Sequence, residues 1–461
     1  MWQVIALLYV IVGLGILVAV ARRPSLFWPM LIIAAVFSAG LMVKEYTFID
    51  EGFVGCVLIA GIMAISIRAI RVRNKQENIW EHLHEWIFYL MTIYLVVESI
   101  RGMLWWEDFG KMRWVVFFAM LGILAFMMAK GDFPRLKRKA MLLIIAGSIL
   151  AYFIIYLASG LIIENVLGGS RWSAQTIEWP STAYAFFPLI IGMPAAIMLL
   201  SERNRSLRWI GWAVILLSII CAFYYQSRVS LIYMLILSPF LLFKLNIRRV
   251  VLLITVILII FGLFMGAGYN KKFTDQIVFF RYDLSRTIEG LRNWDTNQAD
   301  IDRKVHLEAG FSSIKDNWES LFFGYGYRTH GVMIGPQLRT LWESKGFPEV
   351  AKGVAYDTST EGFTAFLVDT GLIGMLLLIM NFLLVGRRIL MQKTNRNRPI
   401  FLIALAFAFL WIFVINMLDI VLFYLLIMPS GLLLQLCNYE TKEQAIVVEM
   451  QDDPILIHRR L

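Results

Sequence analysis

The sequence predicts an all-α polytopic membrane protein with about 12 to 13 transmembrane helices and one large, partly helical exterior loop. Three observations predict this fold class. The chain of 461 residues is 59% hydrophobic and only 16% charged. Its mean hydropathy is +0.70, and apolar stretches of about 20 residues, the length that one bilayer crossing needs, recur along most of it. A soluble domain could not cover its surface with such a composition, so lipid is the expected environment of most side chains.

The apolar segments are expected to be helices that cross the bilayer. They are 2–20, 25–43, 52–70, 86–100, 114–130, 140–163, 184–200, 208–226, 229–245, 249–268, 362–386, 399–417 and 420–437. The first has no basic region before it and no small-residue cleavage site after it, so we expect a retained helix. No Pro/Ser/Gly-rich linker divides the chain, which favours a single membrane domain over 1–461.

Basic residues fall mainly in alternate loops, and this alternation predicts the side that each loop faces. The expected cytoplasmic loops are those with clustered Lys and Arg, at 22–23, 71–75, 135–139, 203–208, 244–249 and 387–398. The long loop at 269–361 then faces outward, and the polar tail at 438–461 faces the cytoplasm. Because topology accounts for the net charge of +10, no nucleic-acid partner is expected.

The loop at 269–361 is far longer than the few residues that usually join two helices. Between 301 and 318, apolar side chains recur near helical spacing at Ile301, Val305, Leu307, Phe311 and Ile314. Part of the loop is therefore expected to fold as an amphipathic helix. The whole loop is expected to form an ordered cap over the outer membrane face.

Arginines outside the cytoplasmic loops are the first candidates for ligand binding, because guanidinium binds phosphate in a fixed fork and keeps its charge. The candidates among them are Arg171, Arg228, Arg281, Arg286, Arg292, Arg303, Arg328 and Arg339. A lipid-linked phosphate is the expected anion, although an arginine in such a loop more often faces solvent or lipid headgroups. Arg228 differs from the others because it opens an apolar run at the expected membrane edge, where a charge is costly unless paired or used.

A Gly-x-Gly motif flanked by aromatic residues lies within the long loop, at Gly324 and Gly326. Glycine lets the backbone approach a ligand closely, but it suits any tight turn equally well. The motif does not follow a strand and contains no Gly-Lys-Ser/Thr sequence, so nucleotide-binding fingerprints do not apply.

Several side chains of the loop are candidates for a general base. His306 and His330 are the two histidines of the loop, too few for a metal cage of histidines, and either has a suitable imidazole. Asp357, Glu361 and Asp369 are rival bases where the loop returns to the membrane. Asp369 lies inside an apolar segment, where an unpaired carboxylate would be costly, so we expect it to pair with an arginine.

In their order along the chain, these features resemble the O-antigen polymerase and ligase superfamily. The resemblance rests on Ser227-Arg228 opening a helix, Arg303 before the amphipathic stretch that leads to Gly324 and Gly326, and the sequence Val-Asp-Thr-Gly-Leu-Ile-Gly at 368–374. It covers the topology and roughly residues 224–390. It implies an inverting, metal-independent glycosyltransferase, without a cofactor, that takes a glycan from undecaprenyl pyrophosphate on the outer face of the bacterial cytoplasmic membrane.

The resemblance also implies roles for residues. Arg228 and Arg303 are expected to contact the pyrophosphate, with His330 or Glu361 as the base. The expected substrate-binding residues are Arg171, Arg292, Arg328, Gly324, Gly326 and Asp369. The expected partners are the undecaprenyl-pyrophosphate-linked glycan and the lipid bilayer, and the resemblance allows a chain-length regulator and a flippase alongside.

The chain departs from the family at Thr360 and Glu361, where ligases usually have a His-Asn pair before the Gly-Leu-Ile-Gly helix. Either Glu361 takes over as base, or His330 reaches in from the loop, or the acceptor differs from a lipid A core. The departure favours a polymerase, which joins two lipid-linked repeat units, over a ligase.

A carrier of lipid-linked oligosaccharides or solutes is the alternative from another class, since many helices with intramembrane charges also describe carriers. It predicts internal repeats and broken helices. The two halves show no convincing similarity, and the dominant exterior loop favours an enzyme that acts at the outer surface.

Overall fold

The computed structural model describes 83–107, 112–129, 138–165, 182–202, 204–224, 228–243, 298–354, 362–392 and 397–414, with a few isolated positions between 11 and 22. Every regular element within these ranges is a helix, so the described part of the chain is all-α, as the sequence predicts. The expected helices at 25–43, 52–70, 249–268 and 420–437, and most of that at 2–20, lie outside the described residues.

Apolar helices occupy the remaining expected segments. They are α4 (Leu83–Trp106), α5 (Met112–Ala129), α6 (Arg138–Asn165), α7 (Thr182–Leu200), α8 (Arg205–Tyr224), α9 (Arg228–Phe243), α16 (Gly362–Met391) and α17 (Arg398–Val414). Leu, Ile, Met, Ala and Phe dominate them on all sides, the composition of helices that are not half-exposed to water. Two of them are long and apolar enough to cross a membrane, by length and composition: 86–106, with a mean hydropathy of 1.5, and 362–391, with 2.1.

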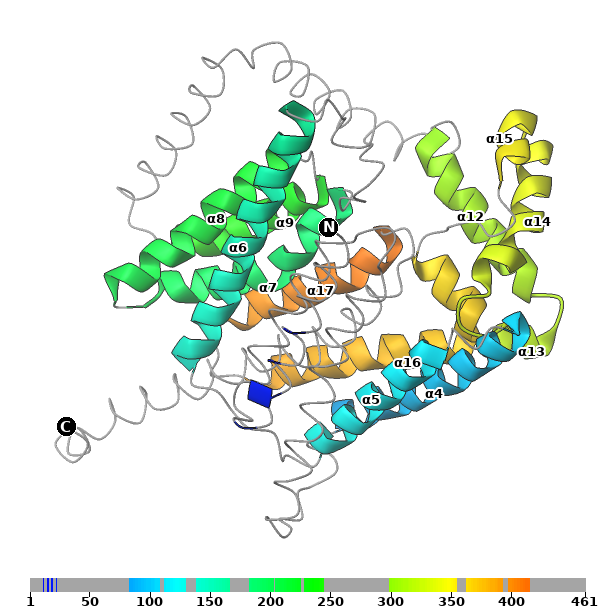
Figure 1. The fold of residues 1–461 in the computed structure, drawn as a ribbon, viewed down its shortest axis with the longest axis horizontal. Helices are drawn as coiled ribbons and strands as arrows, with labels where there is room; N and C mark the ends of the chain where they lie inside the picture. The colour runs from blue at the N-terminus through cyan, green and yellow to red at the C-terminus, as the bar shows by residue number, and fades with distance from the viewer. Residues whose placement is uncertain are drawn as a thin grey trace, which may run out of the picture.

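These helices pack as two neighbouring groups (Figure 1). In one group, α5 lies along α4, and α16 packs against α4. In the other, α6, α7, α8 and α9 lie together, and α17 joins them to α16. Large side chains such as Phe118, Phe153, Tyr233 and Phe401 are fully buried between the helices.

Four further helices form a cap at one end of α4, α5 and α16 (Figure 1). They are α12 (Gln298–Ile314), α13 (Trp318–Phe323), α14 (His330–Ser344) and α15 (Pro348–Gly353). We use the word cap for residues 298–354, the described part of the long loop. The expectation that part of this loop is helical is confirmed.

The buried positions of α12 differ from those that the sequence predicts. Val305 and Ile314 are buried, but Leu307 and Phe311 are 36% and 43% exposed. Val305 and Ile314 lie on opposite sides of a regular helix, so the buried side chains of α12 do not form a single stripe. The helix ends at Ile314, and the side chain of Asn317 accepts a hydrogen bond from the backbone N–H of Glu319 at the start of α13.

Candidate functional site

The long helix α16 is interrupted at Gly371, which has φ 63° and ψ −167°. Such a backbone conformation is essentially restricted to glycine. The segment before it, 362–370, therefore ends as a helix does, with carbonyls that lack a partner in the next turn. The sequence predicts one uninterrupted helix over 362–386, and this break is the main difference.

Backbone of the cap and one side chain of α4 satisfy the carbonyls at the break. The backbone N–H of Tyr325 donates to the carbonyl of Val368 (3.0 Å), and that of Gly326 donates to the carbonyl of Asp369 (3.0 Å). The hydroxyl of Tyr94 donates to the carbonyl of Thr370 (2.6 Å). The break is thus filled by protein. We call the meeting place of α4, the segment 322–330 and the break in α16 the cap junction.

The two glycines of the Gly-x-Gly motif allow this close packing. Gly324 has φ 68°, and a Cβ there would lie 2.5 Å from the backbone of Asp369. Gly326 has φ 106°, and a Cβ there would lie 2.6 Å from the backbone N of Gly102 in α4. The sequence leaves open whether these glycines approach a ligand or form a tight turn, and in this structure both approach protein backbone.

Asp369 is the central polar residue of the cap junction and is 2% exposed. Its Oδ1 accepts from the backbone N–H groups of Thr329 (3.0 Å) and His330 (2.8 Å). Its Oδ2 accepts from the N–H of Arg328 (2.8 Å) and contacts Nδ1 of His330 (2.9 Å). Four contacts match the acceptor capacity of an ionised carboxylate, which lies where the unpaired N–H groups and the dipole of α14 favour an anion.

The side chain paired with Asp369 is therefore a histidine, where the sequence analysis expects an arginine. The turn before α14 supplies backbone N–H groups that a sequence pattern does not reveal, and these groups stabilise the carboxylate together with the imidazole. Arg328 takes part through its backbone N–H.

His330 begins α14 and is 4% exposed. An ionised carboxylate has no hydrogen to donate, so Nδ1 carries the hydrogen in the contact with Asp369. In the neutral ring, Nε2 is then the nitrogen that accepts a proton. A carboxylate that fixes the tautomer and orientation of an imidazole is the arrangement that general-base chemistry needs.

Arg328 is held in a conformation that is rare for its residue type, with φ 67°. Its carbonyl accepts from Nε1 of Trp106 (3.1 Å), and its guanidinium lies 5.7 Å from the centre of the Trp114 ring. A non-glycine residue in this region costs about 1–3 kcal/mol, and such strain occurs most often at binding and catalytic sites. The backbone of Arg328 therefore contacts Asp369, while its guanidinium lies over the ring of Trp114.

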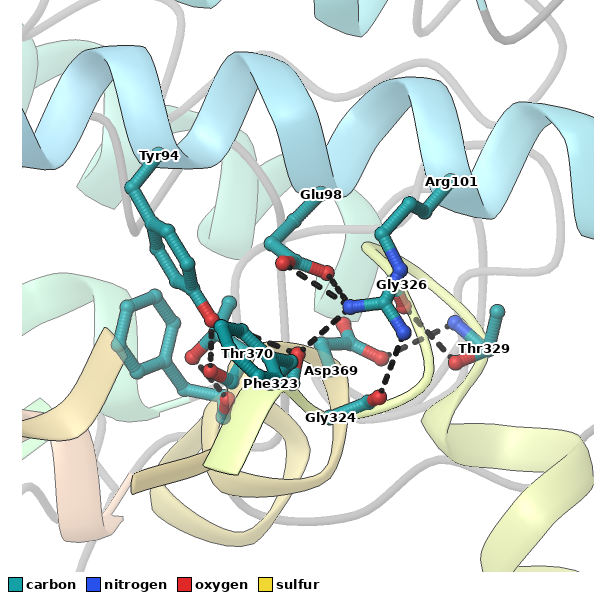
Figure 2. Close-up of polar contacts among 10 residues, drawn as sticks. Tyr94, Glu98, Arg101, Phe323, Gly324, Gly326, Thr329, Asp369 and Thr370 are labelled. Carbon is teal, nitrogen blue, oxygen red and sulfur yellow. Dashed lines mark hydrogen bonds and ion pairs between the residues drawn. The ribbon is translucent and has the colours of Figure 1, made fainter. Parts of the chain in front are cut away.

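An ion pair on α4 contacts the segment 322–330 of the cap (Figure 2). Nη1 of Arg101 lies 2.8 Å and 3.0 Å from the two carboxylate oxygens of Glu98, whose side chain is 1% exposed. The guanidinium also donates to the carbonyls of Phe323 (3.0 Å) and Gly324 (3.1 Å). Arg101 thereby ties α4 to the end of α13.

The sequence analysis did not single out Glu98 or Arg101. The expected helix at 86–100 ends too early. The charge of Arg101 favours a loop after residue 100, whereas α4 continues to Trp106. A carboxylate within an apolar run, three residues before an arginine, was the signal available, since a buried carboxylate needs a partner.

The other predicted site residues are placed only in part. Arg228 is the first residue of α9, and Arg303 lies in α12, but their side chains are outside the described set. Arg171, Arg292 and Glu361 lie outside the described residues. The structure brings together His330, Asp369, Arg328, Gly324 and Gly326.

Comparisons with protein-family models, with curated proteins and with solved structures find no match to this chain. Among the described residues, no three His, Cys, Asp or Glu side chains gather as a metal site would need. Function is therefore inferred from the cap junction and from the sequence pattern.

Replacing Tyr94 with phenylalanine is expected to lower the free energy of unfolding by about 1 kcal/mol, because Thr370 O loses its hydrogen bond. Thermal unfolding in detergent measures this effect, and limited proteolysis should show easier cleavage within 322–330. The control is Ser344→Ala, which removes an exposed hydroxyl that bonds within α14 and should change neither readout. If the two variants unfold and are cleaved alike, the hydrogen bond from Tyr94 does not stabilise the cap junction.

Proposed function

We propose that this chain is a multi-pass glycosyltransferase of the bacterial cytoplasmic membrane that polymerises a surface polysaccharide. It transfers a glycan from undecaprenyl pyrophosphate to a sugar hydroxyl on the outer face. The observation that carries the proposal is the His330–Asp369 pair, held by a folded cap at the broken end of an apolar helix. This combination supplies an imidazole that a buried carboxylate orients, as a general base requires.

Exposed apolar side chains support the membrane assignment. Leu372, Leu376, Leu383 and Leu390 recur along one face of α16 and are 39%, 58%, 66% and 54% exposed. From the break to its end, α16 runs for about 20 residues, or roughly 30 Å, the thickness of the hydrocarbon core. A leucine stripe of that length, with Arg387 exposed on the same face only near its end, suits lipid rather than water.

Charges support the outward orientation of the cap. Arg387 and Arg388 lie at the end of α16 that is remote from the break. The basic loop at 135–139 follows α5, which leads away from the cap. Lys and Arg gather on the cytoplasmic side of membrane proteins, so the cap lies on the opposite side.

The proposed chemistry follows from these groups. An acceptor hydroxyl gives its proton to Nε2 of His330 while its oxygen attacks the anomeric carbon from the face opposite the pyrophosphate. The new glycosidic C–O bond forms as the bond to the pyrophosphate breaks, so the configuration inverts, and the lipid pyrophosphate leaves with the bonding electrons. Asp369 stabilises the imidazolium, and arginines stabilise the charge on the leaving group.

The arginines proposed for that role are Arg228 and Arg303, from the family resemblance, and Arg328, which lies two residues before His330 in the chain. His330 is preferred to Glu361 as the base because a buried carboxylate orients its ring. A ligase would use the same groups with a different acceptor.

One observation favours a carrier, since a broken apolar helix is also a feature of transporters. In carriers, however, the exposed backbone of the break contacts the transported ion or solute. Here the carbonyls of Val368, Asp369 and Thr370 are occupied by the cap and Tyr94. The break therefore supports a rigid site better than a transport path.

The test is glycan chain length, seen as a gel ladder, in cells that lack their own copy and express variants at matched membrane levels. Wild type should restore the ladder, and Arg228→Ala, Arg303→Ala and His330→Ala should leave single repeat units. His306→Ala, which changes the half-buried histidine of α12, is the control and should retain the ladder.

Other outcomes of the same test point to the alternatives. Long chains that stay on undecaprenyl pyrophosphate when the protein is absent would show a ligase. Lipid-linked units that accumulate inside the cell would show a carrier. A full ladder with His330→Ala would remove this residue from the role of base.

A further inference from the structure

The short helix α13 exposes two large aromatic side chains on one face. Trp318 is 69% exposed, and Phe322, one turn later on the same side, is 45% exposed. On the opposite side, Ser320 is buried and Leu321 packs against the core. The helix is thus fixed to the protein along one side and presents aromatic rings along the other.

The aromatic face of α13 adjoins the leucine stripe of α16. A Cβ on Gly371 would lie 2.5 Å from the backbone of Phe322, so the two segments touch at the break. The stripe begins at the next residue, Leu372. The end of α13 and the start of the leucine stripe are therefore neighbours in the fold.

Tryptophans of α4 mark the height of α13 relative to the membrane. Arg101 holds the carbonyl of Phe323 at 3.0 Å, and Trp105, 41% exposed, follows about one turn later on α4. Trp86 lies near the other end of the same helix. Tryptophans gather at both membrane–water interfaces, so α13 lies level with the outer one.

We propose that α13 is an interfacial anchor, whose Trp318 and Phe322 insert between the headgroups and acyl chains of outer-leaflet phospholipids. This inference rests on the membrane location in the proposed function. The indole ring suits that region because it is apolar with one polar N–H. Since α13 leads directly into the cap junction, the anchor sets the height of the His330–Asp369 pair at the level of lipid-linked phosphates.

The experiment places a nitroxide label at single cysteines in the full-length protein, in phospholipid nanodiscs. The native residues Cys56, Cys221 and Cys437 are first replaced by alanine. Collision rates are measured with oxygen, which concentrates in lipid, and with a water-soluble nickel chelate. The test positions are Trp318→Cys and Phe322→Cys.

Two further positions calibrate the measurement. Leu383→Cys on the leucine stripe reports the hydrocarbon core. Val350→Cys on α15 is a matched control, because this apolar side chain is 38% exposed on a helix that packs on α14. The oxygen-to-nickel ratio is expected to be several-fold higher at 318 and 322 than at 350, and highest at 383.

Contrary outcomes separate the two proposals. If 383 is in lipid while 318 and 322 match 350, the anchor is wrong and the membrane location stands. If 383 also collides mainly with nickel, the membrane location itself fails, and the anchor fails with it. Labels at 318 and 322 that are shielded from both reagents would show a protein covering and overturn the anchor.

Discussion

Replacing Asp369 with alanine is expected to destabilise the folded protein by about 3 to 5 kcal/mol, the usual cost of removing one partner from a buried charged pair. Three backbone N–H groups before and at the start of α14, and Nδ1 of His330, would lose their acceptor together. The loss of stability is measured by unfolding the protein in detergent with heat or with denaturant. Proteolysis should cleave the cap of this variant far faster than that of wild type.

Asp369→Asn separates the catalytic consequence from the structural one. The amide keeps an oxygen that can accept from backbone, and its NH₂ can donate to Nδ1 of His330 if the ring changes tautomer. Nε2 would then carry the hydrogen and could not take a proton from an acceptor. The asparagine variant is therefore expected to lose transfer while its unfolding temperature stays much closer to that of wild type.

The role of Asp369 in orienting His330 is isolated by measuring the transfer rate of the well-folded Asp369→Asn variant as a function of pH. If Asp369 only stabilises the fold, transfer activity should follow the amount of folded protein. Transfer by Asp369→Asn at the wild-type rate would show that the tautomer of His330 does not matter. The proposed base would then have to be sought elsewhere, with Glu361 the first candidate.

Within the described residues, the sequence predicts the helices well because hydrophobic length is a strong signal. The expected 229–245 and 399–417 segments match α9 and α17 closely, since each is a long apolar run between polar residues. The helical nature of part of the cap was also predictable from the recurrence of apolar side chains between Ile301 and Ile314. Bounds failed where a charge lies inside a helix, as at Arg101.

The details of the cap junction could not be predicted, because they depend on contacts between residues that are 39 to 276 positions apart in the chain. Gly371 lies in an apolar run where glycine is tolerated in a helix, and only the approach of Phe322 and Gly324 explains the break. Likewise, His330 and Asp369 were separate candidates in the sequence. Their pairing follows from the way the cap folds back onto α16 and α4.

Contacts to backbone groups hold much of the cap junction together. The carbonyls of Val368 and Asp369, the carboxylate of Asp369 and the guanidinium of Arg101 all contact backbone groups of the segment 323–330. Side chains in that segment can therefore differ without loss of these contacts. The glycines cannot, because they let the backbones meet.

Replacing Gly324 with alanine is accordingly expected to have the second large effect. Its φ of 68° and ψ of −163° lie in a region that costs a non-glycine residue about 1–3 kcal/mol from the backbone alone. In addition, the new Cβ would lie 2.5 Å from the carbonyl of Asp369, so the cap must shift away from α16. That shift would move His330 away from Asp369. Both the free energy of unfolding and the rate of glycan transfer should therefore fall.

Two glycines in the same cap provide matched controls for this substitution. Gly346 also has a positive φ, 83°, but a Cβ there meets nothing within 4 Å, so Gly346→Ala reports backbone strain alone, about 1–2 kcal/mol. Gly353→Ala has open space and no such φ, and should be neutral or slightly stabilising. The loss of stability in Gly324→Ala beyond that in Gly346→Ala measures the close approach of cap and helix. If the two losses are equal and transfer persists, the cap does not need this contact to hold His330 against Asp369.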